Sequence, residues 1–263
     1  MAIRTVIGAA NCLNARPLLW GLREKLAKDS LVLDTPAAIA DMLRRGALEV
    51  GLIPSIEYLR NPDYEMMPEV AVTSNGSLMS VNLICLKPPA LMETVALDTS
   101  SPGAVALCRI ILRKMYSVNP AYIDWSTDAP MESVKAQGFM VAGDAALQMW
   151  PRFDHIIDLS DEWRRLTELP FVHYVWAGPG IRPSIAKLLR DAKEQGMRHL
   201  SRIAWQEAER LDLPSSICLD HLENRVRYEF GESEREGLAR FQHYASELDL
   251  CPSEAEREVP MLG

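Results

Sequence analysis

Small polar side chains gather where predicted strands end, each just before or at a possible helix start. Hydroxyls, amides and the backbone N–H groups of helix N-termini are donors that hold carboxylates. Each residue alone is more often a helix cap than a ligand, but open α/β sheets bind ligands at the carboxyl ends of their strands. Together they predict a site for a small carboxylate. The candidates are Asn11, Asn14, Ser55, Ser77, Ser80, Thr99, Ser100, Ser101, Gly143 and Asp144.

Two aromatic residues and one carboxylate have roles that the sequence leaves open. Phe171 and Trp176 could form an apolar wall of the site, although tryptophans are more often core residues. Asp144 could simply cap the helix that follows it. A carboxylate that faces an anionic ligand is unfavourable unless it accepts hydrogen bonds or acts as a base.

Other kinds of active site are not indicated. The five histidines are scattered, no G-x-S-x-G elbow occurs, and phosphate loops and dinucleotide fingerprints are absent. His173, in the run PFVHYVW, is expected to be a core or hinge residue. Five cysteines without a C-x-x-C pair or a Cys/His cluster predict reduced thiols. We therefore expect no catalytic triad, no metal and no cofactor.

Composition narrows the class of protein. The chain has 263 residues, of which 48% are hydrophobic and 24% charged, as in ordinary globular proteins. A net charge of -8 argues against a nucleic-acid partner. No segment has the roughly 20 apolar residues that span a bilayer, and the first residues do not resemble a signal peptide. We expect a cytoplasmic protein with a small-molecule substrate and no membrane partner.

The elements that must position these residues alternate between strands and helices. We predict strands over 3–9, 31–35, 47–54, 69–74, 81–87, 93–98 and 139–142, and an extended run over 170–177. Helices are predicted over 18–27, opened by Pro17, and over 36–46, 104–115 and 161–169. The alternation of strand, helix and strand over residues 3–54 favours a parallel sheet. The last third is predicted to be all-helical, with a break at Gly196 and a loose end after Cys251.

The order of elements predicts an α/β fold with two lobes and an interlobe cleft. The first lobe would comprise residues 1–87 and 177–263, and the second lobe would be inserted as residues 88–176. The C-terminal helices would return to pack on the first lobe. The cleft between the lobes is the natural site for the ligand.

Several segments resemble one known family. LNARPLLWGL, LRRGALEVGLIPSIEYLRN, GSLMSVNLICLKP, VAGDAALQMW and DLSDEW with LPFVHYVWA are similar to chorismate dehydratases of the futalosine route to menaquinone. The resemblance runs over roughly residues 5–248. It implies a fold like that of type II periplasmic binding proteins, in a cytoplasmic enzyme.

The resemblance also implies a reaction. A lyase of this family removes water from chorismate and gives 3-[(1-carboxyvinyl)oxy]benzoate, without a cofactor. The matching residues imply that Asn14 and Ser80 position the substrate's own enolpyruvyl carboxylate, which takes the proton. The chain departs from the family at residues 100–104, where SSPGA replaces a Ser-Arg-Thr-Ser stretch. Backbone N–H groups and Ser100 or Ser101 could hold the ring carboxylate instead.

Two other functions remain open. The missing arginine favours a non-catalytic protein that binds a small carboxylate. The later enzyme of the same pathway, which makes a dihydroxynaphthoate from a cyclic futalosine derivative, shares the fold. LNARP and GLIPSIEYLR favour the dehydratase over that enzyme.

Overall fold

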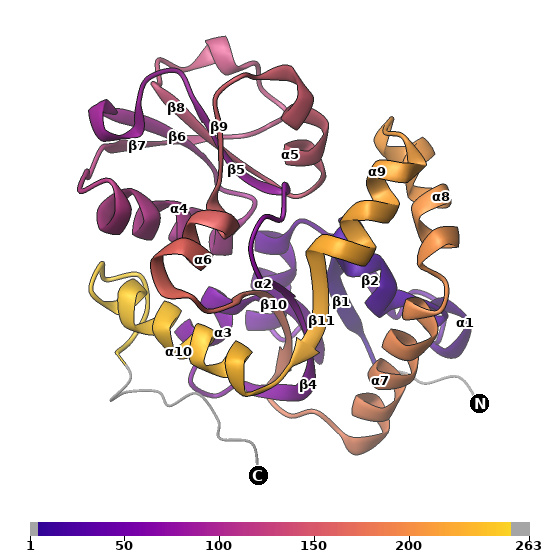
Figure 1. Cartoon of the computed structure of the whole chain (residues 1–263). Coiled ribbons are helices and arrows are strands. Elements are labelled where there is room, and N and C mark those ends of the chain that lie inside the picture. Colours follow the sequence, from indigo (N-terminus) through magenta and orange to yellow (C-terminus); the bar gives the residue numbers. More distant parts are fainter. Residues whose placement is uncertain (1–4, 254–263) are drawn as a thin grey trace.

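Two β-sheets, each covered by helices, form the two lobes of the molecule (Figure 1). The computed structural model describes residues 5–253. Part of the predicted first strand and most of the predicted loose end therefore lie outside the described residues. No helix within the described range has the length and apolar character needed to cross a membrane.

The first lobe holds a mixed sheet of six strands in the order β11-β4-β10-β3-β1-β2. The strands β1, β2 and β3 are parallel to one another, as predicted. The strands β10, β4 and β11 each run antiparallel to their neighbours. The strands are β1 (Ile7–Ala10), β2 (Leu31–Asp34), β3 (Val50–Pro54), β4 (Glu65–Ser74), β10 (Phe171–Gly178) and β11 (Val226–Phe230). The parallel sheet predicted from the first three strands is thus confirmed for β1, β2 and β3, and the antiparallel strands extend that sheet.

The second lobe holds five strands in the order β7-β6-β8-β5-β9. They are β5 (Val81–Cys85), β6 (Thr94–Asp98), β7 (Ala121–Trp125), β8 (Gly138–Ala142) and β9 (Ile156–Asp158). The edge strands β7 and β9 were not predicted. β9 has only three residues, and both strands are only partly buried, so they lack the hydrophobic pattern that identifies a central strand.

The helices lie between these strands and in the C-terminal third. They are α1 (Leu22–Lys25), α2 (Pro36–Arg44), α3 (Ser55–Arg60), α4 (Pro102–Met115), α5 (Asp144–Met149), α6 (Leu159–Thr167), α7 (Pro183–Met197), α8 (Leu200–Leu211), α9 (Ser215–Asp220) and α10 (Glu232–Ser246). Side-chain hydrogen bonds cap the starts of α2 and α6. Thr35 accepts a hydrogen bond from the Ala38 N–H at 3.2 Å, and Asp158 accepts from the N–H groups of Ser160 and Asp161.

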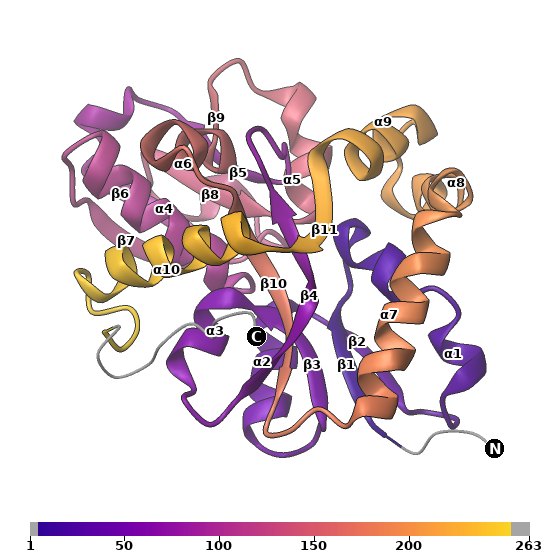
Figure 2. The ribbon, with the colours of Figure 1, turned by 60° about the horizontal axis from the view of Figure 1, so that its bottom comes forward.

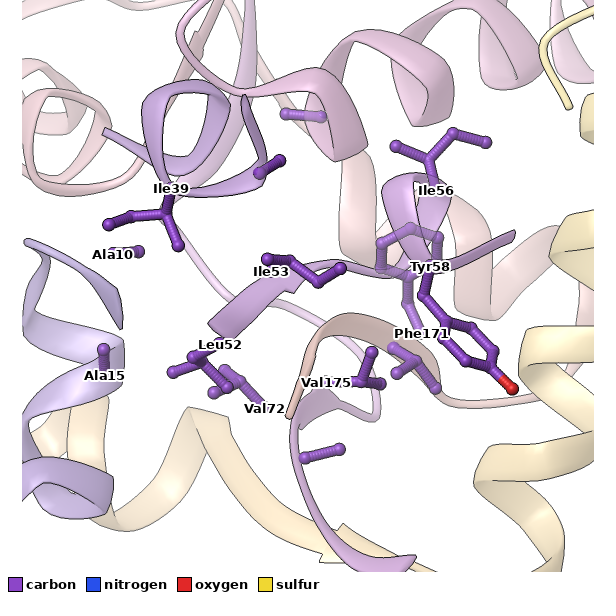
Figure 3. Packing of buried hydrophobic residues seen from close by; sticks show 14 of the residues in the cluster. Ala10, Ala15, Ile39, Leu52, Ile53, Ile56, Tyr58, Val72, Phe171 and Val175 are labelled. Carbon is purple, nitrogen blue, oxygen red and sulfur yellow. The ribbon is translucent and has the colours of Figure 1, made fainter. Parts of the chain in front are cut away.

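A continuous core joins the first sheet to its covering helices. In the close view of Figure 3, Ile39 of α2 lies over the strands that carry Ala10 and Leu52. The core continues into aromatic rings, where Phe171 of β10 packs edge-on against Phe241 of α10 at 4.9 Å between ring centres. All five of these side chains are at most 1% exposed. Burial of this kind is the main favourable contribution to folding.

The chain passes between the lobes earlier than predicted, in both directions. β5 belongs to the five-stranded sheet and β10 to the six-stranded one, so the passages lie between Ser74 and Val81 and between Asp158 and Phe171. Passages near residues 87 and 176, as predicted, would assign β5 to the first lobe and most of β10 to the second lobe, which disagrees with the sheets they join. The difference arises because strand sequences do not state which sheet they join. We propose lobe boundaries within these two connecting segments.

The C-terminal third is not all-helical and does not pack on the first lobe alone. β11 pairs with β4, beside which it lies in Figure 2, and it alternates buried and exposed residues in the manner of a sheet edge. Helices α8 and α9 pack together, and both contribute side chains to a buried cluster that includes a residue of the second lobe. Leu147 of α5 shares a buried cluster with Leu13 and Leu200, and Gln148 Nε2 donates to the Leu211 carbonyl at 2.6 Å.

Two predicted helix boundaries were wrong. A 3₁₀ helix, η1, already begins at Leu13 and ends at Leu19, so Pro17 lies inside it rather than opening a longer helix. The helix break predicted at Gly196 instead lies at Arg198 and His199, between α7 and α8, and Gly196 belongs to α7. Gly196 serves packing instead. A Cβ atom there would lie 1.9 Å from the Pro17 carbonyl oxygen.

This close approach of α7 to η1 gives a stability prediction. The change Gly196→Ala should force the two elements apart and lower the free energy of unfolding by about 1–3 kcal/mol, as overpacking does. The melting temperature should fall by about 2–4 °C for each kcal/mol. Gly180→Ala is the matched control, because nothing lies within 4 Å of a Cβ atom there. Equal melting of both variants would contradict the packing argument.

Candidate functional site

A cavity of about 350 Å³ lies between the two sheets. Its volume is typical of small-molecule sites. Strand ends of both lobes and the loops after them supply its walls, as the sequence predicted. The lining residues are Asn11, Cys12, Leu33, Asp34, Thr35, Pro36, Asp98, Ser100, Ser101, Thr127, Ala142, Gly143, Asp144 and Tyr174.

Two helix N-termini open onto this cavity from opposite lobes. α2 begins at Pro36 and α4 begins at Pro102, directly after the lining residues Thr35 and Ser101. The N–H group of Ala37 donates to the Ser100 carbonyl at 3.0 Å, so the two helix starts meet across the cleft. Helix N-termini favour negative charge. Among the described residues that line the cavity, none is Lys, Arg or His, so an anion here would be held by backbone and hydroxyl donors.

Asp144 joins three parts of the molecule at the cavity wall. One carboxylate oxygen accepts the N–H of Leu13 from η1 at 2.8 Å, and the other accepts from the guanidinium of Arg210 on α8 at 2.6 Å. Arg210 also pairs with Glu207, which pairs with Arg16 of η1 at 2.8 Å. Asp144 therefore faces the cavity as a neutralised carboxylate. Its hydrogen bonds hold the lobes together.

Asp98 is a second carboxylate in the wall, at the end of β6, and it has no cationic partner among the described residues. Its side chain is buried, and one oxygen accepts the Ser100 N–H at 3.1 Å. Burial raises the pKa of Asp98 above its ordinary value, and the hydrogen bonds from Ser100 counteract this only in part. A carboxyl group of this kind is common at functional sites.

Neutral groups complete the walls. Burial raises the pKa of the Cys12 thiol to about 12, with a further contribution from the charge of Asp144. Burial also raises the pKa of Tyr174 well above its ordinary value. Both groups are therefore protonated at neutral pH. Cys12 lacks the thiolate that a nucleophilic cysteine needs.

A narrow extension of about 20 Å³ shares Ser101, Ala142 and Tyr174 with the main cavity. Phe171 and His173 line it. His173 is buried and lies 2.9 Å from Ser74 Oγ, and burial, helped by His221, lowers its pKa to about 3. His173 is thus a neutral hydrogen-bonding partner.

Asn14 and Ser80 lie behind the cavity and do not line it. Asn14 Nδ2 donates to Ser80 Oγ at 3.2 Å, and both side chains are buried. The pair is close to the wall along the chain, because Cys12 precedes Asn14 by two residues. Across β5 and β8, the N–H of Gly143 donates to the Ser80 carbonyl at 2.7 Å. The role predicted for the pair stays a prediction.

The other predicted site residues divide into two groups. Asn11, Ser100, Ser101, Gly143 and Asp144 line the main cavity, and Phe171 lines its extension. Four residues lie elsewhere. Ser55 donates to the Val172 carbonyl, Ser77 donates to Asp158, Thr99 is exposed and Trp176 is fully buried in the core.

The sequence missed several lining residues, and some of them could have been found. Asp98, Asp34 and Thr35 end predicted strands, so the rule that selected the serines applies equally to them. Tyr174 gave no such signal, because it lies in the middle of β10. Among residues 5–253, no group of three His, Cys, Asp or Glu side chains is arranged to hold a metal ion.

Comparison with known proteins assigns the chain to a family. A family model described as menaquinone biosynthesis matches residues 5–247. The chain belongs to this menaquinone biosynthesis family. The resemblance stated from the quoted segments is thereby confirmed. A relative, named chorismate dehydratase, of Thermus thermophilus is 29% identical over 258 residues, which cover 90% of this chain and 93% of the relative.

Solved structures agree on the fold. Protein AF1704 of Archaeoglobus fulgidus matches with a TM-score of 0.73 and 12% identity, over 93% of this chain and 97% of its own. The alkanesulfonate-binding protein SsuA of Xanthomonas axonopodis pv. citri, solved with MOPS, matches with a TM-score of 0.67 and 12% identity, over 96% and 94%. These similarities confirm the predicted two-lobed fold of periplasmic-binding-protein type.

The buried Asp98 gives a pH prediction. Because its pKa is raised in the folded chain, the folded state keeps this proton at pH values where the unfolded chain has lost it. The ionised group therefore destabilises the fold above its folded pKa and makes no difference well below about pH 3.9. Asp98→Asn should unfold at a higher temperature than the wild type at pH 8, with the gap closing toward low pH.

Thermal melting between pH 3 and pH 8 measures this difference, and the exposed Asp124→Asn is the matched control. Equal stability of Asp98→Asn and the wild type at pH 8 would show that the ionised Asp98 carboxylate does not destabilise the folded state.

Proposed function

We propose that this chain dehydrates chorismate to 3-[(1-carboxyvinyl)oxy]benzoate in menaquinone biosynthesis. The observation that carries the proposal is the likeness to a chorismate dehydratase along nearly the whole of both chains, within one family. The cavity adds chemical support. It offers hydroxyls, an amide and the start of α4 to a small carboxylate, at the interface between the lobes. The dipole of α2 also favours negative charge there, although its first N–H groups are already hydrogen-bonded.

The reaction demands little from protein side chains. Loss of the ring hydroxyl and of the neighbouring ring hydrogen makes the ring aromatic, so the overall change is favourable. In our proposal the enolpyruvyl carboxylate of the substrate takes the ring proton and passes it to the departing hydroxyl group, so the C–H and C–O bonds break, a ring double bond forms and water leaves. A well-oriented group in the same molecule can act with an effective molarity of about 10⁵ M or more. The protein must therefore mainly orient the dianion and exclude water.

The charges around the cavity suit this task. Asp144 is paired with Arg210, so it adds little repulsion toward a dianion. Asp98 would have its pKa raised further by a bound dianion, because nearby negative charge favours the protonated form. Ser100 and Ser101, beside the start of α4, are placed to receive the ring carboxylate without the arginine found elsewhere in the family.

Asn14 and Ser80 are proposed to orient the enolpyruvyl carboxylate at the Gly143 end of the cavity. Their mutual hydrogen bond would be exchanged for hydrogen bonds to that carboxylate when substrate binds. The arrangement behind the wall supports this role, since Ser80 is bonded through its carbonyl to the lining residue Gly143. Cytoplasmic location stays a prediction from the sequence.

A direct assay tests the proposed function. Purified protein mixed with chorismate should remove the diene absorbance and produce one aromatic acid and water. Binding of chorismate by calorimetry without any product would favour the carboxylate-binding protein. Inertness toward chorismate, combined with formation of a dihydroxynaphthoate from the cyclic futalosine derivative, would favour the later enzyme of the pathway.

Asn14→Ala and Ser80→Ala should each lower kcat by about 10²-fold, as loss of one preorganised donor does in other enzymes. KM should change less than kcat, because the contacts proposed here matter most while the proton is transferred. Steady-state kinetics with chorismate measure both constants, and the exposed Asn119→Ala is the control. Normal turnover by both variants would refute the assigned roles.

A further inference from the structure

Asn14 is held from two sides inside the protein. On one side its amide nitrogen donates to Ser80 Oγ at 3.2 Å, and on the other its amide oxygen lies 2.5 Å from His221 Nε2. All three side chains are buried, with Ser80 fully enclosed and His221 1% exposed. The three residues come from η1, from the position just before β5 and from the C-terminal third, so only the fold brings them together.

The chemistry of this contact is that of a neutral donor. The Asn14 amide oxygen can only accept, so His221 Nε2 must carry the proton that joins them. Burial, helped by the charge of Arg225, lowers the pKa of His221 to about 4, although Asp220 and the Leu78 backbone counteract this. His221 therefore donates as an uncharged imidazole at neutral pH. By binding the amide oxygen of Asn14, His221 fixes the orientation in which the amide nitrogen points to Ser80.

The backbone around His221 is itself specialised. His221 is the first residue of a π-helical turn, η5 (His221–Arg225), between α9 and β11. Such wide turns are rare and are frequent at functional sites. Asp220 accepts from Asn224 at 2.9 Å and from Arg225 at 2.8 Å, which closes the turn on its outer side. Val226 then pairs with Ser74 of β4, so the turn is fixed at both ends.

We infer that His221 is a positioning residue of the dehydratase, which acts by holding the Asn14 amide in the orientation that the reaction needs. This inference rests on the proposed function. Without the imidazole, the amide could rotate, and its N–H groups would no longer point reliably toward Ser80 and the substrate carboxylate. Misplacement of an orienting group lowers the rate of the chemical step more than it lowers binding.

Two conservative variants separate positioning from simple burial of a polar group. The amide nitrogen of Gln reaches about as far as Nε2 of His, whereas the amide of Asn is one carbon shorter and cannot reach Asn14. His221→Asn should lower kcat about 10-fold with a smaller change in KM, which corresponds to about 1.4 kcal/mol. His221→Gln should restore kcat to within about threefold of the wild type, a residual cost of about 0.7 kcal/mol.

A double variant tests whether His221 acts through Asn14. Adding His221→Asn to Asn14→Ala should cause no further loss of kcat, because the residue that His221 positions is already absent. Circular dichroism and thermal melting of every variant check that the fold is intact, so a loss of kcat in a melted protein is not counted. Comparison at a temperature where all variants are folded keeps the kinetic readout valid.

Three results would overturn the inference. Wild-type kcat in folded His221→Asn would show that the contact does not serve the reaction. Equal loss in His221→Gln and His221→Asn, or multiplying losses in the double variant, would show that His221 does not work by donating to Asn14. An inactive wild type would instead overturn the proposed function, and this inference with it.

Discussion

The hydrogen bonds of one carboxylate, Asp144, hold the cavity in the shape described here. They tie the second lobe to η1 through Leu13 and to α8 through Arg210. Without such ties, two lobes joined by two connecting segments can move relative to each other, as hinged proteins do. The buried cluster of Leu13, Leu147 and Leu200 lies at the same junction. Polar and apolar contacts therefore support one closed arrangement, and the C-terminal helices take part in it.

Charge is the second constraint on this cavity. Three carboxylates, those of Asp34, Asp98 and Asp144, face a space whose described lining has no cationic side chain. Asp34 is partly exposed to solvent and accepts the Thr35 N–H at 2.7 Å. Pairing with Arg210 neutralises Asp144, and burial favours the protonated form of Asp98. The starts of α2 and α4 add a partial positive potential. The wall can therefore accept an anion, although the whole chain carries a net charge of -8.

Behind the cavity wall, three uncharged side chains are linked by consecutive hydrogen bonds. His221 donates to Asn14, and Asn14 donates to Ser80. Buried polar groups must be paired, since an unmet partner costs about 1–3 kcal/mol. A chain of three paired residues thus restricts the orientation of each member. This explains how an asparagine and a serine can be oriented with no charged residue in the chain that links them.

The sequence by itself determined the α/β class, the starts of helices such as α2 and the polar residues at strand ends, because these depend on neighbouring residues. The turn at Gly143 and the alternation of strands with helices are local effects. The polar strand ends they define include five of the fourteen residues that line the cavity, namely Asn11, Ser100, Ser101, Gly143 and Asp144. The sequence motifs also indicated the family to which the chain belongs.

Only the tertiary structure decided which strands share a sheet, where the chain passes between lobes and which polar groups meet. β5 and β10 joined other sheets than expected because strand pairing depends on distant partners. Ser55 and Ser77 had the right residue type but point to the Val172 carbonyl and to Asp158. His221 showed no signal, since its partner lies 207 residues away. Contacts at such separations are set by packing of the whole chain, which local sequence patterns do not record.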